Sequence, residues 1–304
     1  MKYFVIANPA SGRGKSAEKI PLIEETLRSY ALDFQLVQTI EPGHAIKLAE
    51  QAAREGYDIV VAVGGDGTIN EVLNGIMLSY PDSSSRPALG IISIGTGNDL
   101  AYGLEQEQNI ETACKLIAKS TRRKIDMGHI VTDDLPEGRY FANGLGIGFD
   151  AAGGILAEKI KWPRGFLAYL IAALQNIFLY YQAPTLQIIM DGETIEMPTL
   201  LISVMNGRRI GGGFMTAPEA FIDDGLFDLC IAEEVSRPRM LTLLPRFVQG
   251  TQFNEPEVQM KRTNKLQVNV LKGSMPIHTD GEIICSASKK ATIEILPLSL
   301  EIIG

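Results

Sequence analysis

The sequence predicts an α/β domain with a parallel sheet, followed by a second, mainly antiparallel β domain. Its 304 residues correspond to two domains of about 150 residues each, or to one large domain. Up to about residue 125, continuous apolar runs alternate with stretches of helical spacing, which is typical of parallel strands covered by helices on both faces. After Asp126, short apolar runs bounded by Asp-Gly and glycine-rich turns indicate antiparallel strands. The predicted domain boundary therefore lies near residue 125.

In the first half, strands and helices are expected to alternate. Each predicted strand is a short β-prone or continuous apolar run, and each predicted helix repeats its apolar residues every three or four positions. The strands are expected at residues 3–7, 34–39, 58–63 and 89–94. The helices are expected at residues 16–29, 43–55 and 69–79.

In the second half, short strands are expected around two helical segments. The strands are expected at residues 186–190, 200–205, 226–232, 266–271 and 292–296. The helical segments are expected at residues 151–181 and 237–249. No internal repeat accompanies them.

One segment, residues 166–181 (FLAYLIAALQNIFLYY), is apolar enough to be considered as a membrane span. The run is shorter than the roughly 20 apolar residues that a span needs, and Gln175 and Asn176 interrupt it. A buried or partly exposed helix is one interpretation. The other is a helix whose apolar side lies against a membrane surface or a lipid tail, with Lys159, Lys161 and Arg164 at the headgroups.

Composition excludes several classes of protein. The sequence has 28 Lys and Arg against 36 Asp and Glu, and the net charge of -8 disfavours a general nucleic-acid binder. Cys114, Cys230 and Cys285 are too far apart for a disulfide framework or a zinc spacing, so a reducing cytoplasm is expected. The first apolar run passes straight into a glycine loop rather than into a signal-peptide cleavage site, so secretion is not expected.

Three polar glycine loops follow three of the predicted parallel strands. They read NPASG at 8–12, GGDGTINE at 64–71 and GTGND at 95–99. Main-chain N–H groups at a strand end and a helix N-terminus favour phosphate, and glycine lets the phosphate approach the backbone closely. Each loop alone could be a tight turn, with Thr68, Asn98 or Asp99 as a helix cap. Because the carboxyl ends of parallel strands share one edge of a sheet, the three loops together favour a nucleotide site.

Two familiar phosphate-binding motifs are rejected. PASGRGKS at 9–16 ends like a Walker A loop, but Pro9 stands where the first glycine is required. GIGFDA at 146–151 matches a dinucleotide fingerprint, but it lies outside the alternating region and lacks the ribose-binding acid about 20 residues further on. The sequence therefore predicts a site of close backbone packing at 146–151.

Two acidic motifs stand in the second half. Asp223-Asp224-Gly225 could hold a hard cation through carboxylate and carbonyl oxygens, or could simply be a turn that enters a strand. TDGE at 279–282 presents two carboxylates around a glycine. The same Asp-Gly-Glu tripeptide at 191–193 is predicted to be a plain hairpin turn, so the tripeptide alone does not indicate function.

Taken together, the motifs resemble the diacylglycerol kinase catalytic family, the lipid kinases that also include sphingosine, ceramide and bacterial lipid kinases. The resemblance covers nearly the whole chain and includes NGLGIGFDA at 143–151. GGDG alone is shared with NAD kinases and 6-phosphofructokinases, whereas the ordered combination is far more specific. The resemblance implies an ATP-binding α/β domain at 1–125, to which residues 295–304 return, and a β-sandwich lipid-substrate domain at 126–294.

The resemblance also implies an ATP- and Mg²⁺-dependent kinase that phosphorylates the hydroxyl of diacylglycerol or a similar lipid, giving phosphatidic acid or a related phospholipid. Asp280 or Glu282 would be the general base. A structural Mg²⁺ would be held by the Asp224 side chain and the main-chain oxygens of Phe221 and Leu226, while Asp99 and Asp126 would lie near Mg-ATP. The implied ATP contacts are Asn8, Pro9, Ala10, Ser11, Gly12, Thr39, Gly64, Gly65, Asp66, Gly67, Thr68, Ile69, Asn70 and Thr96.

Two alternatives remain open. One is a kinase for a soluble acceptor such as NAD. The other is a non-catalytic nucleotide or lipid sensor, against which the intact GGDGT and TDGE motifs argue. The expected partner is a lipid substrate. The protein is expected to be cytoplasmic and to contact the inner face of a membrane peripherally. A homodimer is also considered, and nucleic acid is not expected as a partner.

Overall fold

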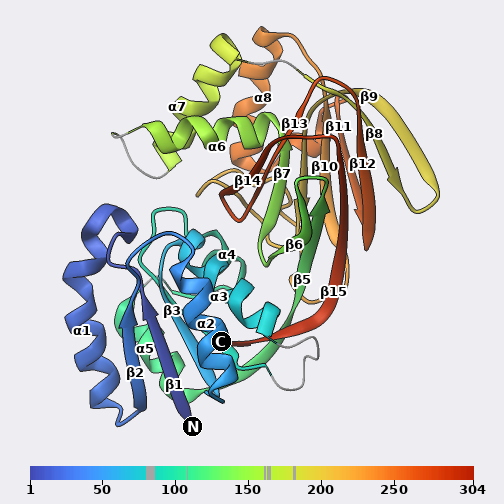
Figure 1. Cartoon of the computed structure of the whole chain (residues 1–304). Helices are drawn as coiled ribbons and strands as arrows, with labels where there is room; N and C mark the ends of the chain where they lie inside the picture. Colours follow the sequence, from blue (N-terminus) through green and yellow to red (C-terminus); the bar gives the residue numbers. More distant parts are fainter. Residues whose placement is uncertain (80–85, 108, 161, 163–165, 181–182) are drawn as a thin grey trace. The chain divides into compact units, whose positions relative to one another are not determined.

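The computed structural model describes residues 1–79, 86–107, 109–160, 162, 166–180 and 183–304. The chain forms two compact units (Figure 1). Unit 1 consists of Met1–Met127 and Pro297–Gly304, and unit 2 consists of Gly128–Leu296. Two strands, β5 (Arg122–Thr132) and β15 (Lys290–Ile303), carry the chain from one unit into the other.

Unit 1 is built on a parallel sheet in the order β4–β3–β1–β2. Its strands are β1 (Lys2–Ala7), β2 (Asp33–Gln38), β3 (Ile59–Gly64) and β4 (Ala88–Ser93). The end of β15 adds a further parallel strand, with Ile302 opposite Leu89. Every residue of β3 is buried, which is why this central strand is a continuous apolar run.

Helices cover both faces of this sheet (Figure 1). They are α1 (Lys15–Ser29), α2 (His44–Arg54), α3 (Asp66–Ser79), α4 (Asp99–Gly103) and α5 (Ile110–Lys119). On one face, apolar residues of α1 and α5 such as Ile23 and Ile117 pack on Val5 and Val61. The predicted α/β parallel-sheet class is therefore confirmed for the first half of the chain.

Helix α3 begins three residues earlier than the predicted start at Ile69. The N–H of Ile69 donates to the carbonyl of Gly65 at 3.1 Å, which places Asp66, Gly67 and Thr68 in the first helical turn. The GGDGT motif is therefore partly a helix N-terminus rather than a loop alone.

Unit 2 is a β-sandwich whose strands pair antiparallel, as predicted. Its strands are β6 (Leu135–Phe141), β7 (Gly144–Gly148), β8 (Thr185–Met190), β9 (Glu193–Met205), β10 (Phe227–Glu233), β11 (Val258–Thr263), β12 (Lys265–Lys272), β13 (Met275–Thr279) and β14 (Glu282–Ser288). The long strand β9 pairs with β8 through residues 193–198 and with β7 and β10 through its later residues. The rings of Phe141 and Phe227 stack 5.6 Å apart in the buried core.

The helical part of unit 2 corrects one prediction. The single helical segment expected at 151–181 is divided into α6 (Phe149–Lys159), α7 (Phe166–Gln175) and a π-helical turn, Asn176–Tyr180. Helix α6 ends because Ile160 adopts an extended backbone, with φ -81 and ψ 110. The helix predicted at 237–249 is confirmed as α8 (Arg237–Gln249). Within the described ranges, no helix is both long and apolar enough to span a bilayer.

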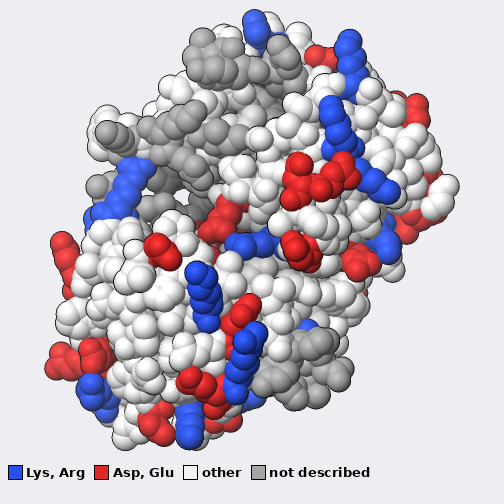
Figure 2. Space-filling model, in the orientation of Figure 1, with Lys and Arg blue, Asp and Glu red and all other residues white. Residues whose placement is uncertain are grey.

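Lys, Arg, Asp and Glu side chains are interspersed on the face shown in Figure 2. On helix α1, Arg28 and Glu24 form an exposed ion pair one helical turn apart, at 2.6 Å. Such pairs contribute only about 0–1 kcal/mol each. On the described part of this face, the excess negative charge is thus spread among cations rather than collected in one patch.

Candidate functional site

The predicted nucleotide loops lie at the carboxyl ends of neighbouring strands of unit 1. Residues 8–12 follow β1, residues 65–70 follow β3, and residues 95–98 follow β4. Thr39 follows β2, and its N–H donates to the carbonyl of Ala7 at 2.9 Å. Because these strands are parallel neighbours, the structure brings the four segments to one edge of the sheet.

Thr68 joins the first two loops. Its Oγ1 accepts a hydrogen bond from Asn8 Nδ2 at 3.0 Å and lies 3.1 Å from Ser11 Oγ. Ser11 Oγ also accepts from the N–H of Gly65 at 3.3 Å. The main chains of the two loops are therefore held at a fixed separation by polar side chains, as a preorganised phosphate site requires.

Asp66 joins the second and third loops. Its two carboxylate oxygens accept from the N–H groups of Asn98 at 2.7 Å and Asp99 at 2.8 Å, at the start of α4. The side chain of Asn98 makes no capping hydrogen bond, so the cap comes from Asp66, 32 residues earlier. A carboxylate at this position also interacts favourably with the positive end of the helix.

Close backbone contact explains two of the glycines. A Cβ added to Gly95 would lie 2.7 Å from the Cα of Gly65 and 2.7 Å from Asn98 Oδ1. A Cβ added to Gly65 would lie 3.2 Å from the Cα of Gly95. The second and third loops can therefore approach this closely only because both positions lack a side chain.

The remaining predicted nucleotide contacts differ in their environments. Thr96 is exposed at the tip of its loop, and Thr39 is buried. Ile69 and Asn70 lie on the buried side of α3, where Asn70 Oδ1 accepts from Asn74 Nδ2 at 3.1 Å. The structure gives these two residues packing contacts, and their contact with a nucleotide stays a prediction.

Glu71, the last residue of GGDGTINE, has a structural role that the sequence did not reveal. Its carboxylate accepts from the N–H of Gly43 at 2.8 Å and of Ala45 at 3.1 Å. Gly43 is the N-cap of α2 and has no side chain with which to cap it. Glu71 thus anchors the segment that follows Thr39 to helix α3.

The two aspartates predicted near Mg-ATP are both buried in unit 1. Asp99 is the first residue of α4. Asp126 Oδ1 accepts from the N–H of Leu298 at 2.7 Å, where the chain returns to unit 1 with a positive φ of 46°. Asp126 therefore holds the returning segment, and its predicted place near Mg-ATP is not tested by this contact.

In unit 2, Asp280 occupies the tight turn between β13 and β14. Both Asp280 and Gly281 have positive φ, 47° and 86°. The carboxylate of Asp280 accepts from three main-chain N–H groups, those of Ala142 at 3.0 Å, Asn143 at 3.0 Å and Gly144 at 2.9 Å. The side chain is thereby fixed in position, and the residue is only 8% exposed.

Glu282, two residues later, is the more accessible of the two carboxylates. Its Oε2 lies 2.7 Å from Arg139 Nη2, and its side chain is 35% exposed against 18% for Arg139. Arg139 is on β6, 143 residues earlier, and its role could not be inferred from local sequence. The pair holds one predicted catalytic carboxylate beside a permanent positive charge.

The glycine motif at 146–151 behaves as predicted, as a site of close packing. A Cβ on Gly146 would lie 2.3 Å from His278 Nε2 and 2.5 Å from Asp150 Oδ2. His278 Nε2 is 3.5 Å from Asp150 Oδ2, and Ser203 Oγ donates to the same oxygen at 3.4 Å. Gly146 makes room for this buried polar cluster next to the Asp280 turn.

All three cysteines are buried and unpaired. Burial raises the pKa of the Cys114 thiol to about 11 and that of Cys230 to about 12, and it also raises the pKa of Cys285. Thiols with such pKa values stay protonated at neutral pH and are poor nucleophiles. The three thiols are therefore not candidates for nucleophilic catalysis.

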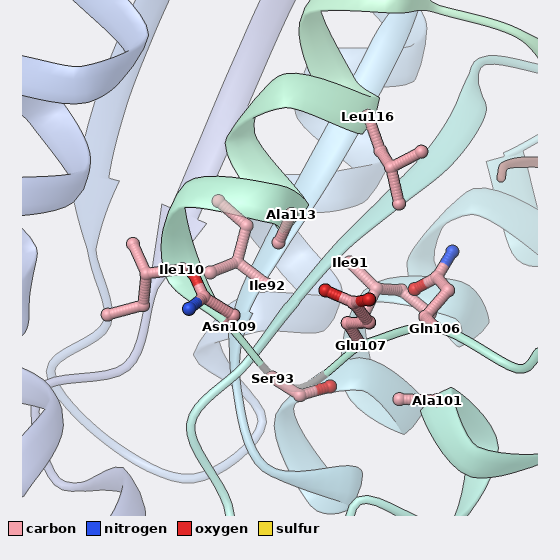
Figure 3. A pocket seen from close by; sticks show the side chains of 10 residues that line it. All are labelled: Ile91, Ile92, Ser93, Ala101, Gln106, Glu107, Asn109, Ile110, Ala113 and Leu116. Carbon is pink, nitrogen blue, oxygen red and sulfur yellow. The ribbon is translucent and has the colours of Figure 1, made fainter.

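A small pocket lies between β4 and α5 (Figure 3). Its apolar lining includes Ile91, Ile92, Ala113 and Leu116, with Ser93 among the polar residues at its edge. None of the predicted nucleotide or acidic residues lines it. This pocket therefore belongs to the packing of α5 on the sheet.

Comparison with known families matches both halves of the chain. The model of the diacylglycerol kinase catalytic domain matches residues 2–130. The model of the YegS C-terminal NAD kinase beta sandwich-like domain matches residues 144–304. The two matches together cover most of the sequence.

Similar proteins carry the same description. A diacylglycerol kinase of Bacillus subtilis (strain 168) is 30% identical over 287 residues, which cover 91% of this chain and 88% of that protein. A diacylglycerol kinase of Mycobacterium tuberculosis (strain ATCC 25618 / H37Rv) is 29% identical over 305 residues, covering 99% and 94%.

Solved structures agree. The crystal structure of a diacylglycerol kinase from Bacillus anthracis has a TM-score of 0.73 at 25% identity, covering 99% of this chain and 96% of that chain. An NAD kinase from Archaeoglobus fulgidus in complex with ATP has a TM-score of 0.55 at 15% identity, covering 100% and 94%, and shares the fold alone.

Proposed function

Because the chain belongs to the diacylglycerol kinase catalytic family, we propose that it transfers the γ-phosphate of ATP to the hydroxyl of diacylglycerol or a similar lipid. The product is phosphatidic acid or a related phospholipid. The family supports a kinase, and the lipid acceptor is the part that this proposal adds. The observation that carries the proposal is the set of glycine loops, joined by Thr68 and Asp66, at one edge of the parallel sheet.

These loops are suited to ATP phosphates. The turn at 11–14 leads into the N-terminus of α1, and residues 64–66 lead into that of α3. Main-chain N–H groups at helix N-termini attract anions, and the close contact of Gly65 with Gly95 keeps side chains out of the way. When Mg²⁺ is bound with ATP, it would neutralise the negative charge on the phosphoryl oxygens.

The acceptor hydroxyl needs a carboxylate that orients it and takes its proton. Asp280 and Glu282 are the candidates, and they lie on either side of one glycine. The three main-chain N–H groups on Asp280 and the guanidinium on Glu282 fix both carboxylates before any substrate binds. Such preorganisation is what efficient proton transfer requires.

A kinase assay with a panel of acceptors tests the proposal. The purified protein is incubated with labelled ATP and diacylglycerol, sphingosine, ceramide or NAD, and the products are separated by solubility and chromatography. Label is expected in phosphatidic acid or a related phospholipid. Phosphorylation of NAD alone would overturn the lipid assignment, and a Glu282→Gln protein prepared in parallel controls for contaminating kinases.

A lipid acceptor also requires access to a membrane surface, and we place this contact at the apolar residues of α7 and its surroundings. Leu167 is 54% exposed, Phe178 is 55% exposed and Trp162 is 84% exposed. Exposed aromatic and aliphatic side chains of this kind lie at membrane interfaces. The basic residues expected at the headgroups, Lys161, Arg164 and the side chain of Lys159, lie outside the described residues.

We expect reversible binding to vesicles that increases with the fraction of anionic lipid. Trp162 is the single tryptophan of the chain, so its emission should shift to shorter wavelength on binding. Phe178→Ser should weaken sedimentation with vesicles, whereas Phe253→Ser, at an equally exposed phenylalanine, should not. Absence of binding at low salt would refute the membrane contact and leave the kinase proposal intact.

A further inference from the structure

The Asp-Asp-Gly turn before β10 is held by an arginine. Asp224 Oδ1 accepts from the N–H of Leu226 at 3.1 Å, two residues later. Asp224 Oδ2 accepts from the guanidinium of Arg262. The same guanidinium lies beside Asp228, with Nε 3.4 Å from Oδ1. One cation thus bridges the turn and the strand that follows it.

The pairing of strands places Arg262 there. Arg262 on β11 is directly opposite Asp228 on β10 in an antiparallel ladder that runs from Phe227–Thr263 to Ala232–Val258. Directly opposite residues project from the same face of the sheet, so the register places the arginine beside the carboxylate. From that fixed point it reaches Asp224, 38 residues away in sequence.

The carboxylates of Asp224 and Asp228 need the positive charge of Arg262. Asp228 is 92% buried, and its Oδ2 has no hydrogen-bond partner within the described residues. The guanidinium of Arg262 supplies a positive charge beside this buried carboxylate and beside Asp224. Without a cation, several acidic side chains would face one another across the turn.

The family resemblance assigns a Mg²⁺ ion to this turn, held by the Asp224 side chain and the main-chain oxygens of Phe221 and Leu226. The donor set does not fit a divalent ion while Arg262 is in place, because the guanidinium already occupies Asp224 Oδ2 and would repel a second cation. We propose that Arg262 replaces the structural divalent cation at this turn. The proposal concerns only the structural ion at this turn and not the Mg²⁺ that binds together with ATP.

Thermal unfolding of the full chain without nucleotide tests this replacement, and it does not depend on catalysis. The wild-type melting temperature is expected to be the same in EDTA and in millimolar Mg²⁺. Arg262→Met should lower the melting temperature in EDTA by about 2–4 °C, the shift for about 1 kcal/mol in a domain of this size. Mg²⁺ should restore most of this loss, because Asp224 and Asp228 can then bind it.

Two matched variants make the result specific. Arg262→Lys keeps a positive charge and should not respond to Mg²⁺, while Asp224→Asn combined with Arg262→Met should lose the rescue. Stabilisation of the wild-type chain by Mg²⁺ that Asp224→Asn abolishes would overturn the proposal, since the metal would then bind beside Arg262. This comparison decides the matter even where Arg262→Met fails to fold.

Discussion

Replacing Glu282 with Gln is expected to lower the turnover number by at least about a hundredfold, the lower range for loss of a positioned acid or base. Gln has the shape of Glu but cannot accept the proton of the acceptor hydroxyl, and it weakens the pair with Arg139. ATP should still bind, because the substitution changes no residue of the three glycine loops. Steady-state kinetics with diacylglycerol and a titration with a fluorescent ATP analogue measure the two effects separately.

Asp280→Asn should lower turnover by a similar factor and also lower the melting temperature. Three main-chain N–H groups point at the Asp280 carboxylate, which only accepts hydrogen bonds, whereas an Asn side chain would turn an NH₂ toward some of them. A buried donor left unsatisfied costs about 1–3 kcal/mol. The melting temperature therefore separates a structural effect at Asp280 from a catalytic effect at Glu282.

The chain contains its own control for both variants. Asp191-Gly192-Glu193 is the same tripeptide at another hairpin turn, between β8 and β9, with positive φ at Asp191 and Gly192. Glu193 is even paired with a cation, Lys261, at 3.1 Å. Asp191→Asn and Glu193→Gln should leave turnover unchanged. Full activity in both Asp280→Asn and Glu282→Gln would show that the general base lies elsewhere.

Gly95→Ala is expected to weaken ATP binding by at least about tenfold. The new Cβ would lie 2.7 Å from the Cα of Gly65 and from Asn98 Oδ1, so the second and third loops must separate. Overpacking of this kind costs about 1–3 kcal/mol, and about 1.4 kcal/mol corresponds to a factor of ten in affinity. Calorimetric titration of the purified variant with Mg-ATP measures the loss.

Gly153→Ala is the matched control. A Cβ at Gly153, within α6, meets no atom within 4 Å, and alanine favours a helix more than glycine does. Its affinity for ATP should equal that of the wild-type chain. An unchanged affinity in Gly95→Ala would mean that the contact between the two loops does not shape the nucleotide site.

Much of unit 1 could be predicted because its sequence has strong local signals. Strand β3 is buried along its whole length and is therefore a continuous apolar run. Unit 2 was harder to predict. Strand β7 consists of Gly144–Gly148, and glycine normally disfavours strands, so the sequence indicated only close packing there. The first residues of β9 are largely exposed and polar, which hid the length of that strand.

The segments of the candidate site were predictable, but their mutual contacts were not. Glycine loops after apolar strands are recognisable in one stretch of sequence. Hydrogen bonds such as those of Asp66 with Asn98, Glu71 with Gly43 and Glu282 with Arg139 join residues 32, 28 and 143 positions apart. They depend on strand order and register, which no single segment of sequence specifies. The same limit applied to Arg262, whose place opposite Asp228 follows from the β10–β11 ladder.

The return of Pro297–Gly304 to unit 1 has a consequence for synthesis on the ribosome. Unit 2 is one continuous stretch, so all of it has been translated before the last strand of unit 1 exists. The pairing of Ile302 with Leu89 and the hydrogen bond from Leu298 to Asp126 can form only after all of unit 2 has been translated. Domains generally fold as units during synthesis, the earlier one first. Here the order is reversed, and the nascent chain completes the parallel sheet of unit 1 only after unit 2 has been made.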